Sequence, residues 1–312
     1  MIHYSVLKTE SINGLNIKPD GIYVDCTLGY AGHSSEILKQ LTTGHLYAFD
    51  QDINAINYST KELSKISNNF TIIHDNFSNI LEQLNEIGVE KVDGILYDLG
   101  LSSPQIDNTE RGFSFQRDAR LDMRMNESDQ ISAYDIINNY KEEELTNIFY
   151  IYGEEKLSKA ISRKIVAKRT SKEIETTLEL VETIKEAVGL KYFNLQHPER
   201  QIFQAIRIEV NNELGVLRKT IPDAIKLLNV GGRISVITFH SLEDRIVKQI
   251  FKQQSDIDPL IKGLPSIPDK YLPVLKLVNK KPILPTELEI QENSRSKSAK
   301  LRVVEKIKNE EE

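Results

Sequence analysis

Three aspartates each end a short apolar run of the chain. Asp25 ends "IYVD", Asp50 ends "HLYAFD" and Asp98 ends "GILYD". The first run leads into "CTLGYAGHSS", where Gly29 and Gly32 let the backbone approach a ligand closely and a helix can begin. Acids at strand ends, together with a glycine loop between a strand and a helix, predict a site for a nucleoside cofactor.

The glycine loop departs from the dinucleotide pattern G-x-G-x-x-G because it lacks the third glycine. Asp25, directly before the loop, would repel a pyrophosphate and attract the ammonium group of an amino-acid-bearing cofactor. S-adenosylmethionine carries such an ammonium and no phosphate, so we expect it in preference to NAD. Asp50 is placed to accept hydrogen bonds from the ribose hydroxyls, and Phe77 to cover the adenine. Ordinary turn and cap residues are the alternative explanation.

The segment "LSSPQ", residues 101–105, follows the Asp98 strand where amino methyltransferases place a proline-containing turn. An exocyclic base amine attacks poorly because its lone pair is delocalised into the ring. Oxygens that accept its N–H groups turn the lone pair toward a sulfonium methyl, without metal or covalent nucleophile. We therefore expect Ser103, Pro104 and Asp98 to serve the transfer step. A Ser-Pro turn that only starts a loop is the alternative.

The elements that must position these residues alternate between strands and helices, which predicts a parallel sheet. The expected strands lie at residues 22–24, 45–49, 70–73, 94–97, 234–239, 275–278 and 300–304. The expected helices of this sheet lie at 34–41, with Ser34 or Ser35 as N-cap, and at 55–64, 80–86 and 242–251. We expect one doubly wound α/β domain with a helical insertion between its fourth and fifth strands.

The composition, with 39% hydrophobic and 28% charged residues, is ordinary for a globular protein. The net charge of −6 gives no general attraction for nucleic acid, so a polyanion would have to meet a local basic patch. Cys26 is the only cysteine, which excludes an intrachain disulfide and a cysteine-based zinc site. No signal-peptide pattern is present, and no apolar run approaches the ~18 residues of a membrane span. We expect a cytoplasmic protein with no metal and no membrane partner.

Short motifs occur along nearly the whole chain. They are "HYSVL" (3–7), "DCTLGYAGHS" (25–34), "DLGLSSPQ" (98–105), "RGFSF" (111–115), "LDMRM" (121–125), "YGEE" (152–155), "HSLEDRIVK" (240–248) and "ENSRSKSAKLR" (292–302). In this order they closely resemble the bacterial 16S ribosomal RNA (cytosine-N4)-methyltransferase family. The resemblance implies an S-adenosylmethionine-dependent enzyme that methylates the N4 amine of a decoding-centre cytidine in 16S ribosomal RNA, with the RNA of a 30S subunit or its precursor as its partner.

The resemblance also implies a fold and a set of cofactor contacts. The fold is α/β, a Rossmann-like class I methyltransferase sheet (1–108 and 219–312) with an inserted, mainly helical substrate-recognition domain (109–218). The family's cofactor contacts correspond here to Ala31, Gly32, His33, Asp50, Phe77, Asp98 and Gln105. Ala31 stands where many members have glycine, and Ser294 and Lys297 where proline and arginine are common. The motifs alone leave other RNA targets and the oligomeric state open.

An acidic protein that binds RNA must supply positive charge locally. Residues 156–172 include seven basic residues and no acid, and a helix there would turn Ile161, Ile165 and Val166 inward. We expect phosphate contacts from this stretch, with a solvated helical face as the alternative. The candidate RNA contacts are Arg111, Arg124, Lys164, Lys168, Arg295 and Arg302. Phe113 and Phe115 can stack on an extruded base, although core packing is the more common role.

Two other functions compete with RNA methylation. An oxidoreductase with a degenerate NAD loop would share the fold, and a ribosome-assembly factor would bind RNA without catalysis. A hydrolase triad of His240, Ser241 and Asp244 is disfavoured because the chain has no G-x-S-x-G elbow.

Overall fold

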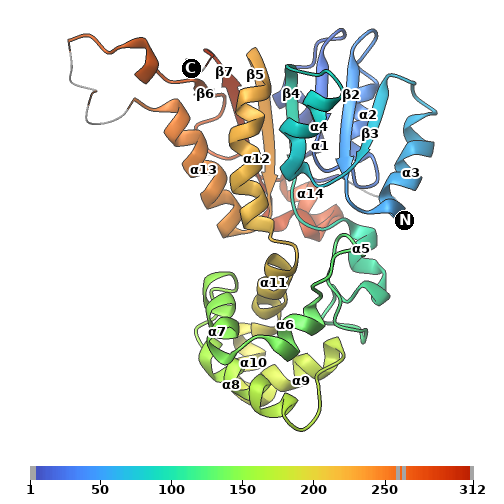
Figure 1. Cartoon of the computed structure of the whole chain (residues 1–312), viewed down its shortest axis with the longest axis vertical. Helices are drawn as coiled ribbons and strands as arrows, with labels where there is room; N and C mark the ends of the chain where they lie inside the picture. The colour runs from blue at the N-terminus through green and yellow to red at the C-terminus, as the bar shows by residue number, and fades with distance from the viewer. Residues whose placement is uncertain (1–4, 258–260, 262–264, 310–312) are drawn as a thin grey trace. The chain divides into compact units, whose positions relative to one another are not determined.

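The structure is a computed structural model, and it describes residues 5–257, 261 and 265–309. The first two residues of the "HYSVL" motif therefore lie outside the described part. The chain divides into two compact units (Figure 1). We call residues 1–100 with 214–312 the sheet unit and residues 101–213 the helical unit, whereas the sequence placed the boundaries at 108/109 and 218/219. No helix in the described part of the chain is long and apolar enough to cross a membrane.

The sheet unit is built on a seven-stranded sheet of order β3-β2-β1-β4-β5-β7-β6. The strands are β1 (Ile22–Asp25), β2 (His45–Asp50), β3 (Phe70–His74), β4 (Val92–Asp98), β5 (Leu228–Thr238), β6 (Leu275–Leu277) and β7 (Lys300–Lys306). The first five in this order pair in parallel, β7 is antiparallel to β5, and β6 is antiparallel to β7. The chain order reverses between β1 and β4, which is where doubly wound sheets bind ligands. The predicted Rossmann-like α/β fold is confirmed.

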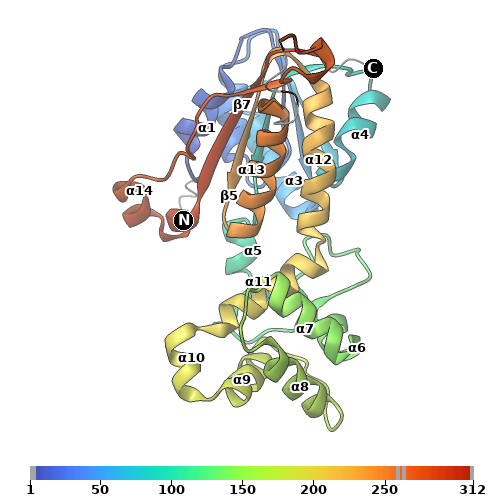
Figure 2. The ribbon, with the colours of Figure 1, turned by 90° about the vertical axis from the view of Figure 1, so that its left-hand side faces the viewer.

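Helices cover both faces of this sheet (Figure 2). They are α1 (Lys8–Leu15), α2 (Gly32–Leu38), α3 (Ile53–Leu63), α4 (Ile80–Glu86), α12 (Glu213–Leu227) and α13 (Ser241–Ser255), while α14 (Glu287–Glu292) has no buried residue. Figure 2 shows α1 on one face of the sheet and α4 with α12 on the other. Ile95, Leu96 and Tyr97 of β4 are consequently all fully buried, as expected for a strand covered on both faces.

The helical unit has a core of its own. Its helices are α5 (Ser103–Asp107), α6 (Ala133–Asn139), α7 (Glu142–Ile151), α8 (Ser158–Arg169), α9 (Thr177–Val188), α10 (Leu190–Gln196) and α11 (Pro198–Val210). Ile161 and Ile165 are fully buried, as the spacing in α8 predicted. Phe113 belongs to the same core, and Phe115 packs edge-on against Phe203 with ring centroids 5.8 Å apart. Both phenylalanines therefore pack in the core.

Candidate active site

The three strand-end aspartates lie at one edge of the sheet, in register with one another. Asp25 of β1 is paired with Ala48 of β2 and with Leu96 of β4. Asp50 and Asp98 therefore each extend two residues, about 7 Å, beyond Asp25 on either side of it. The loop after β1 fills the intervening space, because Leu28 N–H donates to the Phe49 carbonyl and Cys26 N–H to the Leu96 carbonyl. The backbone of this loop is therefore hydrogen-bonded to both neighbouring strands at the sheet edge that the sequence predicted.

Asp25 is fully buried and stabilises this loop by hydrogen bonds. Its carboxylate accepts hydrogen bonds from the Ser34 hydroxyl at 2.6 Å and from Thr27 N–H at 3.0 Å. Burial raises the pKa of Asp25, against the lowering effects of His33 and Ser34. Thr27 Oγ1 also accepts the N–H of Asp98 at 2.7 Å, which fixes the end of β4 to the loop. Asp25 therefore stabilises the loop and is not accessible to a ligand.

Asp98 faces His33, the second residue of α2. His33 Nδ1 lies 3.4 Å from Asp98 Oδ2, and the His33 side chain is only 4% exposed. Burial alone would lower the pKa of His33, but the hydrogen bond and charge of Asp98, with the charge of Asp25, outweigh it and raise that pKa. The other carboxylate oxygen, Asp98 Oδ1, is buried and meets no hydrogen-bond donor among the described residues. This oxygen is positioned to receive a cationic N–H donor.

Asp50 closes the opposite side of the loop. Its Oδ2 accepts Gly29 N–H at 2.8 Å and its Oδ1 accepts Asp52 N–H at 2.9 Å. Burial raises the pKa of Asp50 to about 6, although these backbone hydrogen bonds act to lower it. Each carboxylate oxygen keeps a second lone pair, so Asp50 can still accept from the hydroxyls of a ligand.

The glycine loop has the backbone geometry of a close-approach site. Gly29 has a φ of +47°, and a Cβ placed there would meet nothing nearer than the Thr27 carbonyl at 3.8 Å. Gly32 is required for a different reason, because its Cβ would lie 1.8 Å from Ser5 Oγ. Ala31 between them has a φ of 61°, a left-handed conformation that is costly for a residue with a Cβ. The strained backbone of Ala31 therefore lies two residues after Gly29, where the loop is most open.

The helix after the loop starts earlier than predicted. α2 begins at Gly32 with Ala31 in the N-cap position, so Ser34 and Ser35 are not its caps. The Ser34 hydroxyl binds the Asp25 carboxylate. The prediction was wrong because the left-handed turn at Ala31 brings the chain into helical geometry before either serine is reached.

Phe77 begins the short helical turn after β3 and is half-buried. Its ring lies edge-on to Tyr97 of β4, with centroids 5.6 Å apart. Thr220 of α12 fixes both residues: its Oγ1 donates to the Phe77 carbonyl at 3.0 Å and lies 2.8 Å from the Tyr97 hydroxyl. Thr220 could not be predicted from the sequence, because no local pattern links it to β3 or β4.

In the helical unit, the expected Ser-Ser-Pro-Gln turn is the start of α5. Ser102 is its N-cap and forms a capping box with Gln105, whose Oε1 accepts Ser102 N–H at 3.0 Å. Pro104 occupies the first turn, where its missing N–H costs nothing. The side chain of Ser103 lies outside the described part of the structure. The roles of Ser103, Pro104 and Gln105 in transfer stay predictions.

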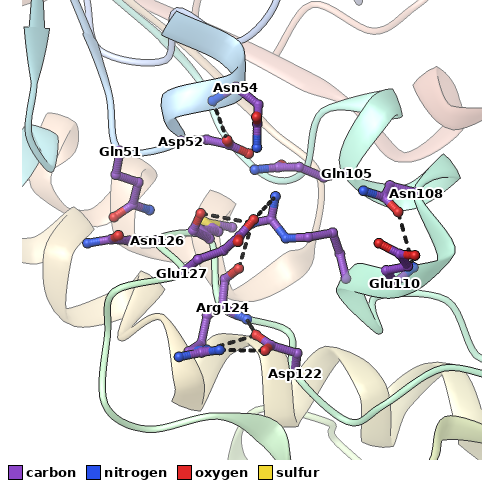
Figure 3. Close-up of polar contacts among 12 residues, drawn as sticks. Gln51, Asp52, Asn54, Gln105, Asn108, Glu110, Asp122, Arg124, Asn126 and Glu127 are labelled. Carbon is purple, nitrogen blue, oxygen red and sulfur yellow. Dashed lines mark hydrogen bonds and ion pairs between the residues drawn. The ribbon is translucent and has the colours of Figure 1, made fainter.

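Two of the candidate RNA contacts, Arg111 and Arg124, are engaged within the helical unit. Arg111 is 8% exposed and donates to the carbonyls of Arg124 and Met125 at 2.8 and 3.0 Å. Arg124 donates from Nε to Asp122 Oδ1 at 2.9 Å and from Nη2 to Asp122 Oδ2 at 2.6 Å (Figure 3). Both guanidinium groups organise the backbone of residues 111–129, and their contact with RNA stays a prediction.

The remaining basic candidates differ in exposure. Lys164 and Lys168 of α8 lie 2.9 and 3.4 Å from the Glu186 carboxylate of α9. The expectation that this stretch has no acids to pair with is therefore wrong, because a neighbouring helix supplies them. In the sheet unit, Arg302 forms a two-pronged ion pair with Asp244, whereas Arg295 is exposed.

Comparison with protein families matches residues 1–307 to the MraW methylase family. The chain belongs to this family. It is 56% identical over 307 residues to the ribosomal RNA small subunit methyltransferase H of Exiguobacterium sibiricum, covering 98% of both proteins. The sheet described above is accordingly that of a class I methyltransferase.

Solved structures of methyltransferases are more distant. An rRNA methylase from Streptococcus thermophilus aligns over 99% of both chains with 13% identity and a TM-score of 0.44. An SAM-dependent O-methyltransferase from Thermotoga maritima aligns over 98% of this chain and 66% of its own with 8% identity and a TM-score of 0.43. Membership of the MraW methylase family rests on the sequence match.

Proposed function

We propose that this protein transfers the methyl group of S-adenosylmethionine to the N4 amine of a decoding-centre cytidine in 16S ribosomal RNA. The observation that carries the proposal is the MraW methylase family match over residues 1–307, with a 56% identical relative named as a small-subunit ribosomal RNA methyltransferase. The substrate in this proposal is the RNA of a 30S subunit or its precursor.

The residues at the sheet edge fit the cofactor. Asp98 Oδ1 is buried without a donor in the described part of the chain, and the ammonium group of the cofactor would supply one. The open face of Gly29 tolerates the close approach of a ligand. Asp50 retains lone pairs for the ribose hydroxyls, and Phe77 offers an apolar ring at the end of β3 for the adenine.

The bound cofactor supplies a methyl group on a positively charged sulfur, which an amine nitrogen can attack. The protein's part is to hold this donor and to orient the acceptor, because no covalent intermediate is needed. Asp98 would hold the mouth of the transfer site from the end of β4. Oxygens at the first turn of α5, from Ser103 and Pro104, are our candidates for accepting the N–H groups of the target amine, and Gln105 for a cofactor contact.

The decisive experiment measures the modified nucleoside. The purified protein is incubated with 30S subunits from a strain lacking its gene, with and without S-adenosylmethionine, and N4-methylcytidine is quantified by mass spectrometry. We expect the modification with wild type and its loss with Asp98→Ala. Asp93→Asn, on the same strand at its other end, is the matched control and should remain active. An unchanged nucleoside profile with wild type would refute the proposal and favour a non-catalytic assembly factor.

Calorimetric titration separates the methyltransferase from the oxidoreductase alternative. We expect binding of S-adenosylmethionine and none of NAD, because Asp98 places negative charge where a pyrophosphate would lie. Tight binding of NAD would contradict the assignment of the cofactor.

A further inference from the structure

One end of the helical unit gathers segments that are distant in sequence. Residues 152–157 join α7 to α8, and the two helices pack together. Tyr192 of α10 donates its hydroxyl to Glu155 of this loop at 2.7 Å, and Gln204 of α11 donates to the Tyr152 carbonyl at 3.0 Å. The end of α7, the starts of α8 and α10 and the part of α11 from Gln201 to Gln204 therefore lie around the loop. We call this surface the loop end of the helical unit.

The loop end carries cations that have no acidic partner. Lys156 and Lys159, at the start of α8, are exposed, as are Lys191 of α10 and Arg200 of α11. Within the described residues, none of the four forms an ion pair. Farther along the chain, Arg163 of α8 pairs with Glu142, Lys164 and Lys168 pair with Glu186, and Lys172, beyond the helix, pairs with Glu179. Arg169 in the last turn of α8 donates to the carbonyls of Ile137 and Tyr140. The exposed cations of this stretch without an acidic or carbonyl partner therefore lie at the loop end, where Glu154 is the only exposed acid of residues 152–157.

Large apolar side chains are exposed beside these cations. Tyr150 and Ile151 at the end of α7 are 65% and 54% exposed, and Leu190 and Leu195 of α10 are 60% and 66% exposed. Protein–protein interfaces are depleted in lysine, so unpaired cations around an exposed aromatic ring favour a polyanion that also has flat bases. Single-stranded RNA has both, because phosphates meet lysine and arginine while bases stack on aromatic rings.

The loop that carries this surface is held from beneath. Glu155 is 1% exposed, and its Oε1 accepts both the Tyr192 hydroxyl and Leu157 N–H, each at 2.7 Å. The start of α8 and the exposed side of α10 are consequently fixed to the same buried carboxylate. Little ordering of the protein is needed when a ligand binds there.

We infer that the loop end binds a single-stranded segment of the substrate RNA, with Lys156, Lys159, Lys191 and Arg200 on phosphates and Tyr150 stacked on a base. This inference rests on the proposed function, since it concerns the same RNA. In this inference the phosphate contacts lie at the start of α8. Lys164 and Lys168 could contact a phosphate only after their ion pairs with Glu186 are broken.

The test uses the full-length protein, protein-free 16S ribosomal RNA, 30S subunits and pairs of substitutions that remove equal charge. We expect Lys156→Gln with Lys159→Gln to raise the KM for RNA about tenfold and to lower the slope of log affinity against log salt by about 2. The kcat at saturating RNA and the cofactor Kd should stay unchanged. Lys65→Gln with Lys185→Gln removes the same charge at two lysines that pair with Glu62 and Glu182, and should change neither quantity appreciably.

Tyr150 is tested with a conservative partner. Tyr150→Ala should weaken RNA binding about tenfold, and Tyr150→Phe should bind as wild type because the ring is retained. Equal losses from both lysine pairs, or no loss from the first, would overturn the inference. So would a loss seen with assembled 30S subunits but not with free RNA, which would indicate a protein partner. A wild type that transfers no methyl group to 30S subunits would instead refute the proposed function, whatever the lysines do.

Discussion

The buried carboxylate of Asp50 should make the stability of the protein fall as pH rises. Burial raises its pKa from 3.8 to about 6. A carboxyl whose pKa is higher in the folded than in the unfolded chain favours folding in its protonated form. Its contribution is present below the unfolded pKa of 3.8 and is lost as the pH rises through about 6. A shift of about 2 units corresponds to about 3 kcal/mol of unfolding free energy.

Asp50→Asn removes this titration without changing the size of the side chain. Two backbone N–H groups, from Gly29 and Asp52, donate to the two carboxylate oxygens, and asparagine offers only one oxygen. The lost hydrogen bond costs the variant about 1–3 kcal/mol independently of pH, because one donor is left facing an amide, and the titration of wild type adds a pH-dependent difference to this cost. The diagnostic quantity is the slope: the stability of wild type relative to the variant should fall by about 3 kcal/mol between about pH 4 and about pH 7.

Urea unfolding of both proteins across this pH range measures the difference directly. Parallel stability curves would refute the assignment of the raised pKa to Asp50. Cofactor titrations give a second readout, since the ionised carboxylate is the better acceptor for ribose hydroxyls. Wild type should lose affinity for S-adenosylmethionine below about pH 6, and Asp50→Asn should bind weakly with little dependence on pH.

Further predictions concern residues whose environments are equally specific. Gly112→Ala should lower the free energy of unfolding by more than about 3 kcal/mol in thermal melts, because φ is +69° and the new Cβ would lie 2.3 Å from the Arg120 carbonyl. Gly88→Ala is its control: φ is +78° but the space around it is open, so the loss should be about 1 kcal/mol. Arg111→Met should destabilise by about 2–4 kcal/mol in urea, since buried carbonyls lose their donor, whereas Arg117→Met at an exposed position should stay within about 0.5 kcal/mol. Thr220→Val should weaken cofactor binding in calorimetry because the Phe77 carbonyl loses its donor, and Thr220→Ser should restore it; equal affinities for all three proteins would count against Phe77 as an adenine contact.

The sheet could be predicted from the sequence because its strands are buried on both faces. Such strands appear as short apolar runs, and the run at residues 94–97 falls within β4. Helix α1 was not predicted, because "KTESINGL" contains only two large apolar residues, Ile12 and Leu15. This helix packs on β5 and β7, which are more than two hundred residues away in the chain. Its formation depends on tertiary contacts that no local pattern reveals.

The positions of the acids in the candidate site could be predicted from the sequence, but the residues that pair with them could not. A strand end fixes where Asp25, Asp50 and Asp98 lie, because parallel strands end at a common edge. The pairing of His33 with Asp98 depends on where α2 begins, and that start is set by a left-handed alanine that sequence statistics disfavour. The basic stretch of α8 shows the same limit, since the acids that neutralise half of it come from α9.

The position of the insertion shows how one chain can combine the sheet edge with a separate helical unit. The chain leaves the sheet unit two residues after Asp98 and re-enters it at Leu214, in the first turn of α12. Within the sheet unit, α12 carries Thr220, which holds both Phe77 and Tyr97. The helix that receives the chain from the insertion therefore also fixes two residues beside the predicted cofactor site. Changes along the Thr220 side of α12 should therefore alter cofactor binding, because Thr220 contacts both Phe77 and Tyr97.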